Sequence, residues 1–330
     1  MFQESGSQPV TVIITAYNAE ATVVRAVRSA LQSPLVERVI VVNDASTDDT
    51  SGVLRNLGDL DGRLLKIEFD RNSGPAAGRN HALSFAHTPF VALLDADDFF
   101  LPGRLELLLA ETDWDMIADN ILFVSQGAEN LVARAAQSTG RQRRLSLEEF
   151  ATRNISKPGN PRGELGFLKP VFKKEFLEQH HLAYDEFLRL GEDFLLYVQA
   201  LAANARFLLH DTIGYVAVER ADSLSAVHRT TDLEALASAA WQVYRSLPSG
   251  PGKQAMRRHN RQLEVKARHR RLLDDKARVG FVRSIGHVIT APKYLLPIAR
   301  SIYADKRSTQ GQTRLGTRTL FGKEEFDRVG

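Results

Sequence analysis

The sequence contains no cysteine, and other features that mark common protein classes are absent as well. Without cysteine, the chain cannot use a disulfide framework, thiol catalysis, cysteine-ligated zinc or an iron–sulfur cluster. No run reaches about 18 uninterrupted apolar residues, so a conventional membrane-spanning helix is not expected. Residues 1–9 are polar and lack the basic and apolar pattern of a secretory signal. These absences predict a cytoplasmic protein.

Two glycine-rich phosphate-binding motifs are also missing. The chain has neither G-x-x-x-x-G-K-[ST] nor G-x-G-x-x-G, so P-loop and dinucleotide-cofactor functions lose their main support. What is present is the composition of an ordinary globular protein, with 330 residues, 43% apolar and 25% charged. This length suggests one large domain with an appendage, or two domains.

Charge is distributed unevenly along the chain. Residues 231–330 hold 20 basic and 9 acidic side chains, which leaves 23 basic and 31 acidic side chains in residues 1–230. The net charge of +3 therefore combines an acidic body with a basic tail. Such a tail usually binds anionic lipid or nucleic acid.

Strand and helix patterns alternate through the first 110 residues. Continuous apolar or β-branched runs indicate buried strands at 10–15, 38–42, 64–69 and 90–94. Helical spacing or helix-start residues follow each run, at 19–31, from a Ser46 or Thr47 cap to 57, at 75–86 and at 102–110. Four such repeats predict an α/β fold, with a mostly parallel sheet and helices on both faces.

The pattern changes after residue 125. Loops are expected at 127–144 and 154–166, and short strands at 206–210 and 214–219. Helices are expected at 173–180, 192–203, 232–246 and 254–278, the last of them densely basic.

Polar side chains follow all four predicted strands, and ligands of such sheets bind beyond the carboxyl ends of the strands. The clearest group is Asp95-Ala-Asp97-Asp98, in which strand alternation would turn Asp95 and Asp97 the same way. That pair suits Mg²⁺ or Mn²⁺ held with substrate phosphates, although an acidic cluster at a helix N-terminus is the alternative. Asp44 would bind a ribose or base or serve as a turn residue, and Tyr17 would stack on a base or pack internally.

Together these segments resemble the family 2 glycosyltransferases of the GT-A fold. Four blocks occur in the order and spacing of that family: TVIITAYN (11–18), VVNDASTDDT (41–50), NSGPAAGRN (72–80) and LLDADDFFLPGRL (93–105). The similarity continues through GFLKPVFKKEF (166–176) and LGEDF (190–194), and more loosely through 215–225. It implies a Rossmann-like GT-A domain over residues 1–230, followed by a basic helical extension over 231–330.

The resemblance implies an inverting transfer from a nucleotide-activated sugar to an acceptor hydroxyl. Carried over residue by residue, it assigns nucleobase contacts to Tyr17 and Asp44, a nucleotide contact to Arg79, a ribose contact to Asp95, metal ligands to Asp97 and His228, and the catalytic base to Asp193. Arg79 would otherwise be a solvated helix-surface arginine, and Glu192-Asp193 a helix-capping pair.

The chemistry agrees with these assignments, because an in-line displacement needs a base for the acceptor hydroxyl and charge stabilisation for the departing diphosphate. Asp193 would supply the first and Mg²⁺ or Mn²⁺ the second. Nucleotidyl transfer on a similar fold is an alternative, but residues 16–19 lack its glycine-rich basic loop. A non-catalytic sugar-nucleotide-binding protein is the other alternative.

The basic segment 253–283 is followed by the apolar segment 281–303, an order that suits peripheral attachment to an anionic membrane surface. The alternative is a basic helix docked on the acidic body. Nucleic-acid binding is not expected, because no recognisable module accompanies the charge.

Relatives that the chain resembles extend bacterial exopolysaccharide units, as in succinoglycan synthesis, on lipid carriers. The resemblance thus implies a UDP-sugar donor, with UDP-glucose first, and a lipid-linked saccharide acceptor at the inner face of the plasma membrane. The Q-x-x-R-W block of processive synthases is absent, so one sugar per encounter is expected.

Overall fold

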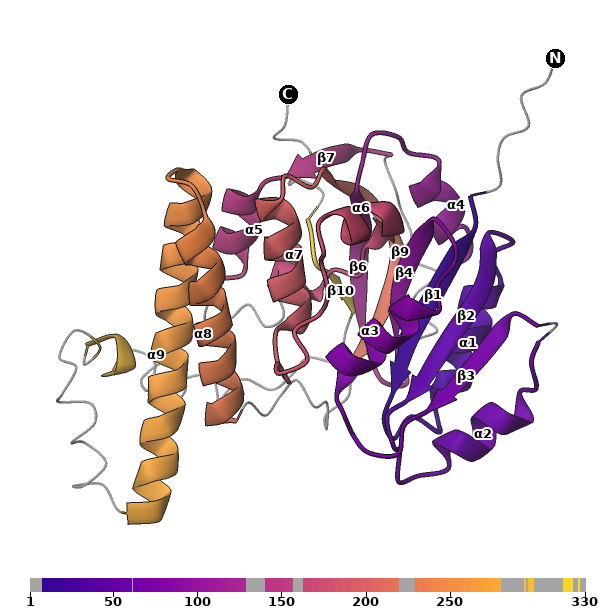
Figure 1. Cartoon of the computed structure of the whole chain (residues 1–330), viewed down its shortest axis with the longest axis horizontal. Helices are drawn as coiled ribbons and strands as arrows, with labels where there is room; N and C mark the ends of the chain where they lie inside the picture. Colours follow the sequence, from indigo (N-terminus) through magenta and orange to yellow (C-terminus); the bar gives the residue numbers. More distant parts are fainter. Residues whose placement is uncertain are drawn as a thin grey trace.

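A computed structural model describes residues 8–60, 62–128, 140–156, 163–219, 229–279, 294, 296–299, 317–322 and 326. These residues form one ten-stranded sheet with helices on both faces (Figure 1). The mixed α/β architecture with a parallel half confirms the predicted fold class.

The parallel half of the sheet comes from the predicted strand–helix repeats. Its strands lie in the order β3-β2-β1-β4 and run over Leu64–Glu68, Val36–Asn43, Val10–Ala16 and Phe90–Asp95. The intervening helices are α1 (Val23–Leu31), α2 (Thr50–Asn56) and α3 (Pro75–Ser84). Because the strand order reverses after β3 and such crossovers are right-handed, α3 covers the face opposite to α1 (Figure 1).

Two helices begin later than the sequence predicts. The helix expected from residue 19 begins at Val23, and the Ala19 and Glu20 N–H groups that precede it donate to Thr50 Oγ1 and an Asp48 oxygen. The helix expected from a Ser46 or Thr47 cap begins at Thr50. Both predicted caps are wrong. Ser46 Oγ accepts the Asn18 N–H, and the N–H and hydroxyl of Thr47 both donate to Asn18 Oδ1.

The other half of the sheet is mixed, and the sequence predicts its helix at 102–110 and strands at 206–219 but none of its other strands. It adds α4 (Arg104–Leu109) and the strands β5 (Phe99–Phe100), β6 (Met116–Ser125), β7 (Gln142–Leu145), β8 (Val171–Lys173) and β9 (Phe207–Glu219). The prediction of a loop over 127–144 is wrong for its last residues, because β7 begins at Gln142 and pairs with β9. The two strands expected at 206–210 and 214–219 are one strand, whose pairing with β6 shifts register opposite Asp119 and Asn120.

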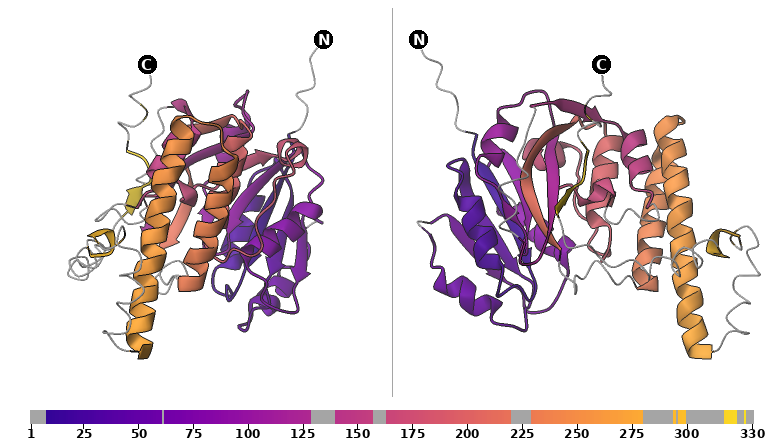
Figure 2. Two further views of the ribbon diagram at one scale, coloured as in Figure 1. Left: turned by 60° about the vertical axis from the view of Figure 1, so that its left-hand side comes forward. Right: turned by 180° about the vertical axis from the view of Figure 1, so that it is seen from behind.

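The remaining helices lie beside this sheet. They are α5 (Leu147–Arg153), a short 3₁₀ helix (Leu165–Phe167), α6 (Lys174–Gln179), α7 (Glu192–Ala202), α8 (Thr230–Ser246) and α9 (Pro251–Val279). Figures 1 and 2 show α8 and α9 side by side, at the end of the molecule remote from β2 and β3. No helix within the described ranges is both long and apolar enough to cross a membrane.

The basic helix α9 docks on the rest of the chain, as one of the two sequence interpretations predicts. Trp241 on α8 donates to Glu264 at 2.9 Å, and Arg271 pairs with Glu234 at 2.8 Å. The buried ring of His259 stacks on Phe194 of α7, with centroids 4.3 Å apart. Aromatic and ionic contacts therefore fix the inner face of α9.

A segment near the end of the sequence also belongs to the sheet. Strand β10 (Thr317–Thr319) pairs antiparallel with β6, and Phe321 is buried beside it. The Asn120 side chain binds both the carbonyl and the N–H of Phe321, at 3.0 and 2.9 Å. Residues 231–330 thus do not lie wholly outside the sheet, and the division of the chain at residue 230 stays a prediction.

The contact between α9 and α7 predicts a pH-dependent stability. Burial lowers the pKa of His259 from its usual 6.5 to about 4, so between these values the unfolded chain binds a proton that the folded chain does not. The wild type should lose up to about 3 kcal/mol of unfolding free energy, relative to His259→Gln, as pH falls from 7 to 4. Urea titrations of both proteins across this range measure the difference, and parallel curves would contradict it.

Candidate functional site

Three of the predicted site residues lie at neighbouring ends of parallel strands. The register pairs Thr15 of β1 with Asp95 of β4, and Ala16 with Asn43 of β2. Tyr17, Asp44 and Asp95 therefore share one edge of the sheet, as the sequence predicts.

Asp44 fixes the loop between β3 and α3. Its two carboxylate oxygens accept the N–H groups of Ser73 and Gly74, at 2.6 and 2.7 Å. Gly74 has φ of 90°, a left-handed conformation that favours glycine. The buried carboxylate thus shapes a loop at the strand ends while each oxygen keeps a second lone pair.

Tyr17 lies on the surface of the same edge, with 38% of its area exposed. It precedes Asn18, whose positive φ of 51° and side-chain bond to Thr47 N–H tie the β1–α1 loop to the β2–α2 loop. The ring of Tyr17 is therefore presented to solvent from a fixed backbone.

The centre of the site is a closed set of ion pairs, the four-residue ring of Arg79, Asp95, Lys169 and Asp193. Arg79 contacts one oxygen of Asp95 and one of Asp193, both at 3.1 Å. Lys169 Nζ contacts the other oxygen of each, at 3.0 Å for Asp95 and 2.7 Å for Asp193. Each carboxylate thus lies between two cations, and each cation between two carboxylates.

The ring connects separate parts of the fold. Arg79 comes from α3, Asp95 ends β4, Asp193 lies in the first turn of α7, and Lys169 precedes β8. Arg79 is buried and also pairs with Glu192 at 2.8 Å, so the prediction that it could be a solvated surface arginine is wrong.

The charges of the ring stabilise one another. Burial alone would raise the pKa of Asp95, but the charges of Lys169 and Arg79 outweigh burial and lower it. Burial alone would lower the pKa of Lys169, but the carboxylates of Asp193 and Asp95 raise it. Both cations and Asp95 are therefore charged at neutral pH.

The geometry around Asp97 differs from the prediction. Strand β4 ends at Asp95 and the chain turns there, with the Asp98 N–H donating to the Asp95 carbonyl at 3.1 Å. Strand alternation therefore does not orient Asp97, which is half-buried in the turn. No three His, Asp or Glu side chains in the described part of the chain gather as metal ligands. His228, the other predicted ligand, lies outside the described residues.

Two site residues were missed by the sequence prediction. Tyr215 Oη accepts the Asp95 N–H at 3.1 Å and lies 2.7 Å from Asp98, which fastens the end of β4 to β9. The pKa of Asp98 is raised well above its usual value, mainly by burial and also by the nearby charges of Asp97 and Asp95.

Lys169 is the other residue that the sequence prediction missed. A single lysine inside the apolar run GFLKPVF could have signalled a buried charge.

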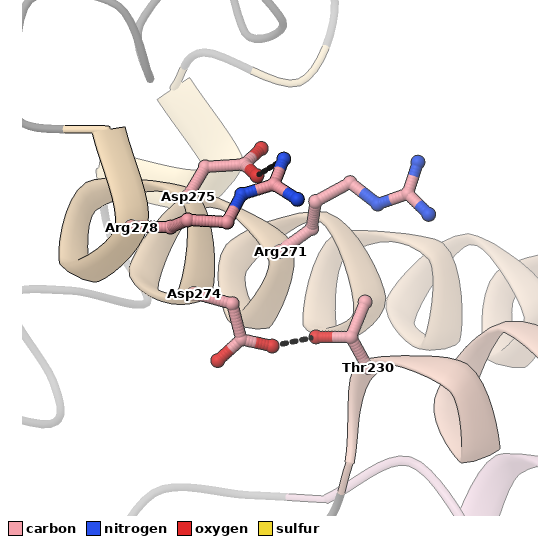
Figure 3. A pocket seen from close by; sticks show the side chains of 5 residues that line it. All are labelled: Thr230, Arg271, Asp274, Asp275 and Arg278. Carbon is pink, nitrogen blue, oxygen red and sulfur yellow. Dashed lines mark hydrogen bonds and ion pairs between the residues drawn. The ribbon is translucent and has the colours of Figure 1, made fainter.

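A cavity elsewhere is a separate feature. Figure 3 shows it between α9 and the start of α8, lined by Thr230, Arg271, Asp274, Asp275 and Arg278. Its charged groups largely satisfy one another, since Asp274 accepts from Thr230 at 2.6 Å and Asp275 pairs with Arg278 at 3.6 Å. It contains no residue of the four-residue ring.

Comparison with known proteins shows the family to which the chain belongs. Residues 11–176 match the family described as Glycosyl transferase family 2. The succinoglycan biosynthesis protein ExoU of Rhizobium meliloti (strain 1021) is 45% identical over 305 residues, which cover 90% of this chain and 87% of that protein. ExoO of the same organism, also a succinoglycan biosynthesis protein, is 34% identical over 234 residues, covering 70% of this chain and 66% of that protein.

Solved structures of S. aureus TarS share the fold. The complex of TarS 1–349 with UDP has a TM-score of 0.59 at 17% identity and covers 96% of this chain and 97% of that chain. The complex with UDP-GlcNAc has a TM-score of 0.58 at 19% identity, covering 86% of this chain and 81% of that chain.

The sheet and these similarities define a glycosyltransferase of the GT-A fold. The chain belongs to glycosyl transferase family 2, which confirms the predicted resemblance.

Proposed function

We propose that this enzyme is a metal-dependent, inverting glycosyltransferase of exopolysaccharide biosynthesis. It moves one sugar from a UDP-sugar, with UDP-glucose the first expected donor, to a hydroxyl of a lipid-linked saccharide. The observation that carries the proposal is the four-residue ring, which holds Asp193 beside Asp95 at the carboxyl edge of the sheet. The UDP and UDP-GlcNAc complexes of TarS support the donor class, and the names of ExoU and ExoO support the pathway class.

The nucleotide would bind across the ends of β1, β2 and β4. The exposed ring of Tyr17 offers a stacking surface for uracil, and Asp44 accepts hydrogen bonds from the base through its remaining lone pairs. Asp95 receives the ribose hydroxyls. Arg79 acts on the nucleotide through Asp95, whose carboxylate it holds in place.

A divalent cation fits this edge of the site through Asp97. Mg²⁺ and Mn²⁺ are bound by one or two carboxylates together with substrate phosphates and waters, so a protein cage of three ligands is not required. Both oxygens of Asp95 contact cations, and those of Asp98 accept hydrogen bonds from Tyr215 and the Val218 N–H, so we assign the metal to Asp97 among the carboxylates of this turn. His228 is the second proposed ligand. When bound, the metal would offset the negative charge of the diphosphate.

Asp193 would act as the base. In a single in-line displacement, the acceptor oxygen forms a bond to the anomeric carbon while the bond from that carbon to the diphosphate breaks. Asp193 takes the proton of the acceptor hydroxyl, and UDP leaves with the bonding electron pair. The buried carboxylate sits in the first turn of α7, where the helix dipole stabilises negative charge.

The proposed base is tested by Asp193→Asn, scored with a panel of UDP-sugars that begins with UDP-glucose. We expect kcat to fall about 10²- to 10⁴-fold, because the amide cannot accept the proton. The affinity for UDP, measured by calorimetry, should stay close to that of the wild type. Asp59→Asn, at an exposed aspartate, is the matched control. Normal transfer by Asp193→Asn would refute the role of Asp193.

The proposed metal ligand is tested by binding alone. Calorimetry should show that Mn²⁺ tightens the binding of UDP to the wild type, because Asp97 would hold a cation whose charge offsets that of the diphosphate. In Asp97→Asn this gain should be lost, while the affinity measured in EDTA stays unchanged. An equal gain in both proteins would contradict the assignment of Asp97.

Helix α9 also carries a surface suited to anionic lipid. Arg257, Arg258 and Arg261 are exposed on its outward face, and none has an ion-pair partner among the described residues. The next arginine on this face, Arg268, lies over the ring of Tyr294 at 4.4 Å, and nearby Leu296 is 60% exposed. We therefore propose peripheral attachment at the inner face of the plasma membrane, where a lipid-linked acceptor would be present.

Membrane attachment is tested with sedimented vesicles at low salt. The wild type should bind vesicles that contain anionic lipid and not neutral ones, and binding should weaken as salt is added. The triple variant Arg257/Arg258/Arg261→Gln should lose most of this binding. A control with three exposed arginines outside α9 replaced, Arg28/Arg55/Arg245→Gln, should keep it. Equal binding to both kinds of vesicle would contradict the proposal.

A further inference from the structure

Lys169 is a buried cation in the centre of the site, and the assignments of donor contacts, metal ligands and base give it no role of its own. It lies between the 3₁₀ helix and β8, and the residue is 8% exposed. Its ammonium group is 2.7 Å from Asp193 Oδ2 and 3.0 Å from Asp95 Oδ2. A lysine is rarely buried unless it is paired, and here it is paired with one residue of the donor site and with the proposed base.

The backbone of Lys169 is held by two side chains from other elements. Arg104 of α4 donates to the Lys169 carbonyl at 2.7 Å, and Tyr197 of α7 donates to the Leu168 carbonyl at 2.9 Å. Arg104 is itself fixed by a buried ion pair with Asp119 of β6 at 2.8 Å. The ammonium group therefore extends from a fixed backbone, so its position does not depend on a mobile surface side chain.

The charge balance of the site requires a second cation. Asp95, Glu192 and Asp193 all lie within 3.1 Å of one guanidinium group, that of Arg79. One positive charge cannot offset three carboxylates, of which Asp193 is buried and Asp95 and Glu192 are partly buried, so their mutual repulsion would otherwise be left uncompensated. Lys169 supplies a second positive charge, and it contacts the oxygen of Asp95 and the oxygen of Asp193 that Arg79 does not contact.

We propose that Lys169 is a positioning residue of the transfer reaction. It holds the Asp193 carboxylate in the orientation in which that group accepts the proton of the acceptor hydroxyl. Because it also holds Asp95, it fixes the base relative to the donor. This inference rests on the proposed function and deepens it, since Lys169 acts through Asp193 and not on the substrate.

The test is Lys169→Met, which keeps the length of the side chain and removes its charge. We expect kcat to fall roughly 100-fold, as a misplacement of about 1 Å does in other enzymes. The acceptor KM and the affinity for UDP should stay within about threefold of the wild type, because Arg79 still holds Asp95 when Lys169 is replaced. Lys169→Arg should recover most of the activity, because a guanidinium group can contact both carboxylates.

The matched control is Lys174→Met, which removes a lysine that pairs with Glu178 on the surface of α6. It should leave kcat unchanged. Thermal unfolding of every variant shows whether it is folded, and Lys169→Arg keeps the test decisive if Lys169→Met does not fold.

Three outcomes would overturn the inference. The first is an unchanged kcat in Lys169→Met. The second is a parallel loss of kcat, UDP affinity and stability that arginine does not recover, which would show a structural role only. The third is the absence of transfer by the wild type itself, which would refute the proposed function as well. Turnover by the wild type together with either of the first two outcomes would refute the role of Lys169 alone.

Discussion

The alternation of charge around Arg79, Asp95, Lys169 and Asp193 is the interaction on which the site depends. Removing four charges from water is costly, and a single buried ion pair rarely offsets that cost. Here each charge has two opposite neighbours, so every desolvated group is compensated twice. The same contacts join α3, β4 and α7 to the segment before β8, and they therefore give the site its shape as well as its charge.

Much of the parallel half could be predicted from the sequence, because the information there is local. The apolar runs of β1, β2 and β4 specify buried strands, and the polar residues that follow them mark the functional edge. The sequence prediction fails after Asp95, where β4 ends and the chain turns. The orientation of Asp97 was inferred from alternation that stops at Asp95. The predicted caps of α2 failed because Ser46 and Thr47 bind a loop nearly thirty residues earlier in the chain.

The rest of the fold depends on contacts between distant segments. Strand β10 is too short to be recognised from its own sequence, and it forms because β6 offers an unpaired edge and Asn120 binds the backbone of Phe321. Lys169 could be seen as an unusual charge in an apolar run. Its partners, however, lie 74 residues before it and 24 residues after it, and no local pattern connects them.

The two faces of helix α9 have different partners, and this arrangement has a geometric consequence. His259 packs inward on Phe194, the residue next to Asp193, while Arg257 and Arg261 lie on the outward face. A helix with its side chains is about 10–12 Å across. Any flat surface that binds those arginines would therefore lie at a constant depth from the reaction centre. The length of the acceptor between its anchor and its reactive hydroxyl would have to match that depth, so the thickness of α9 would set the length of acceptor that the enzyme uses.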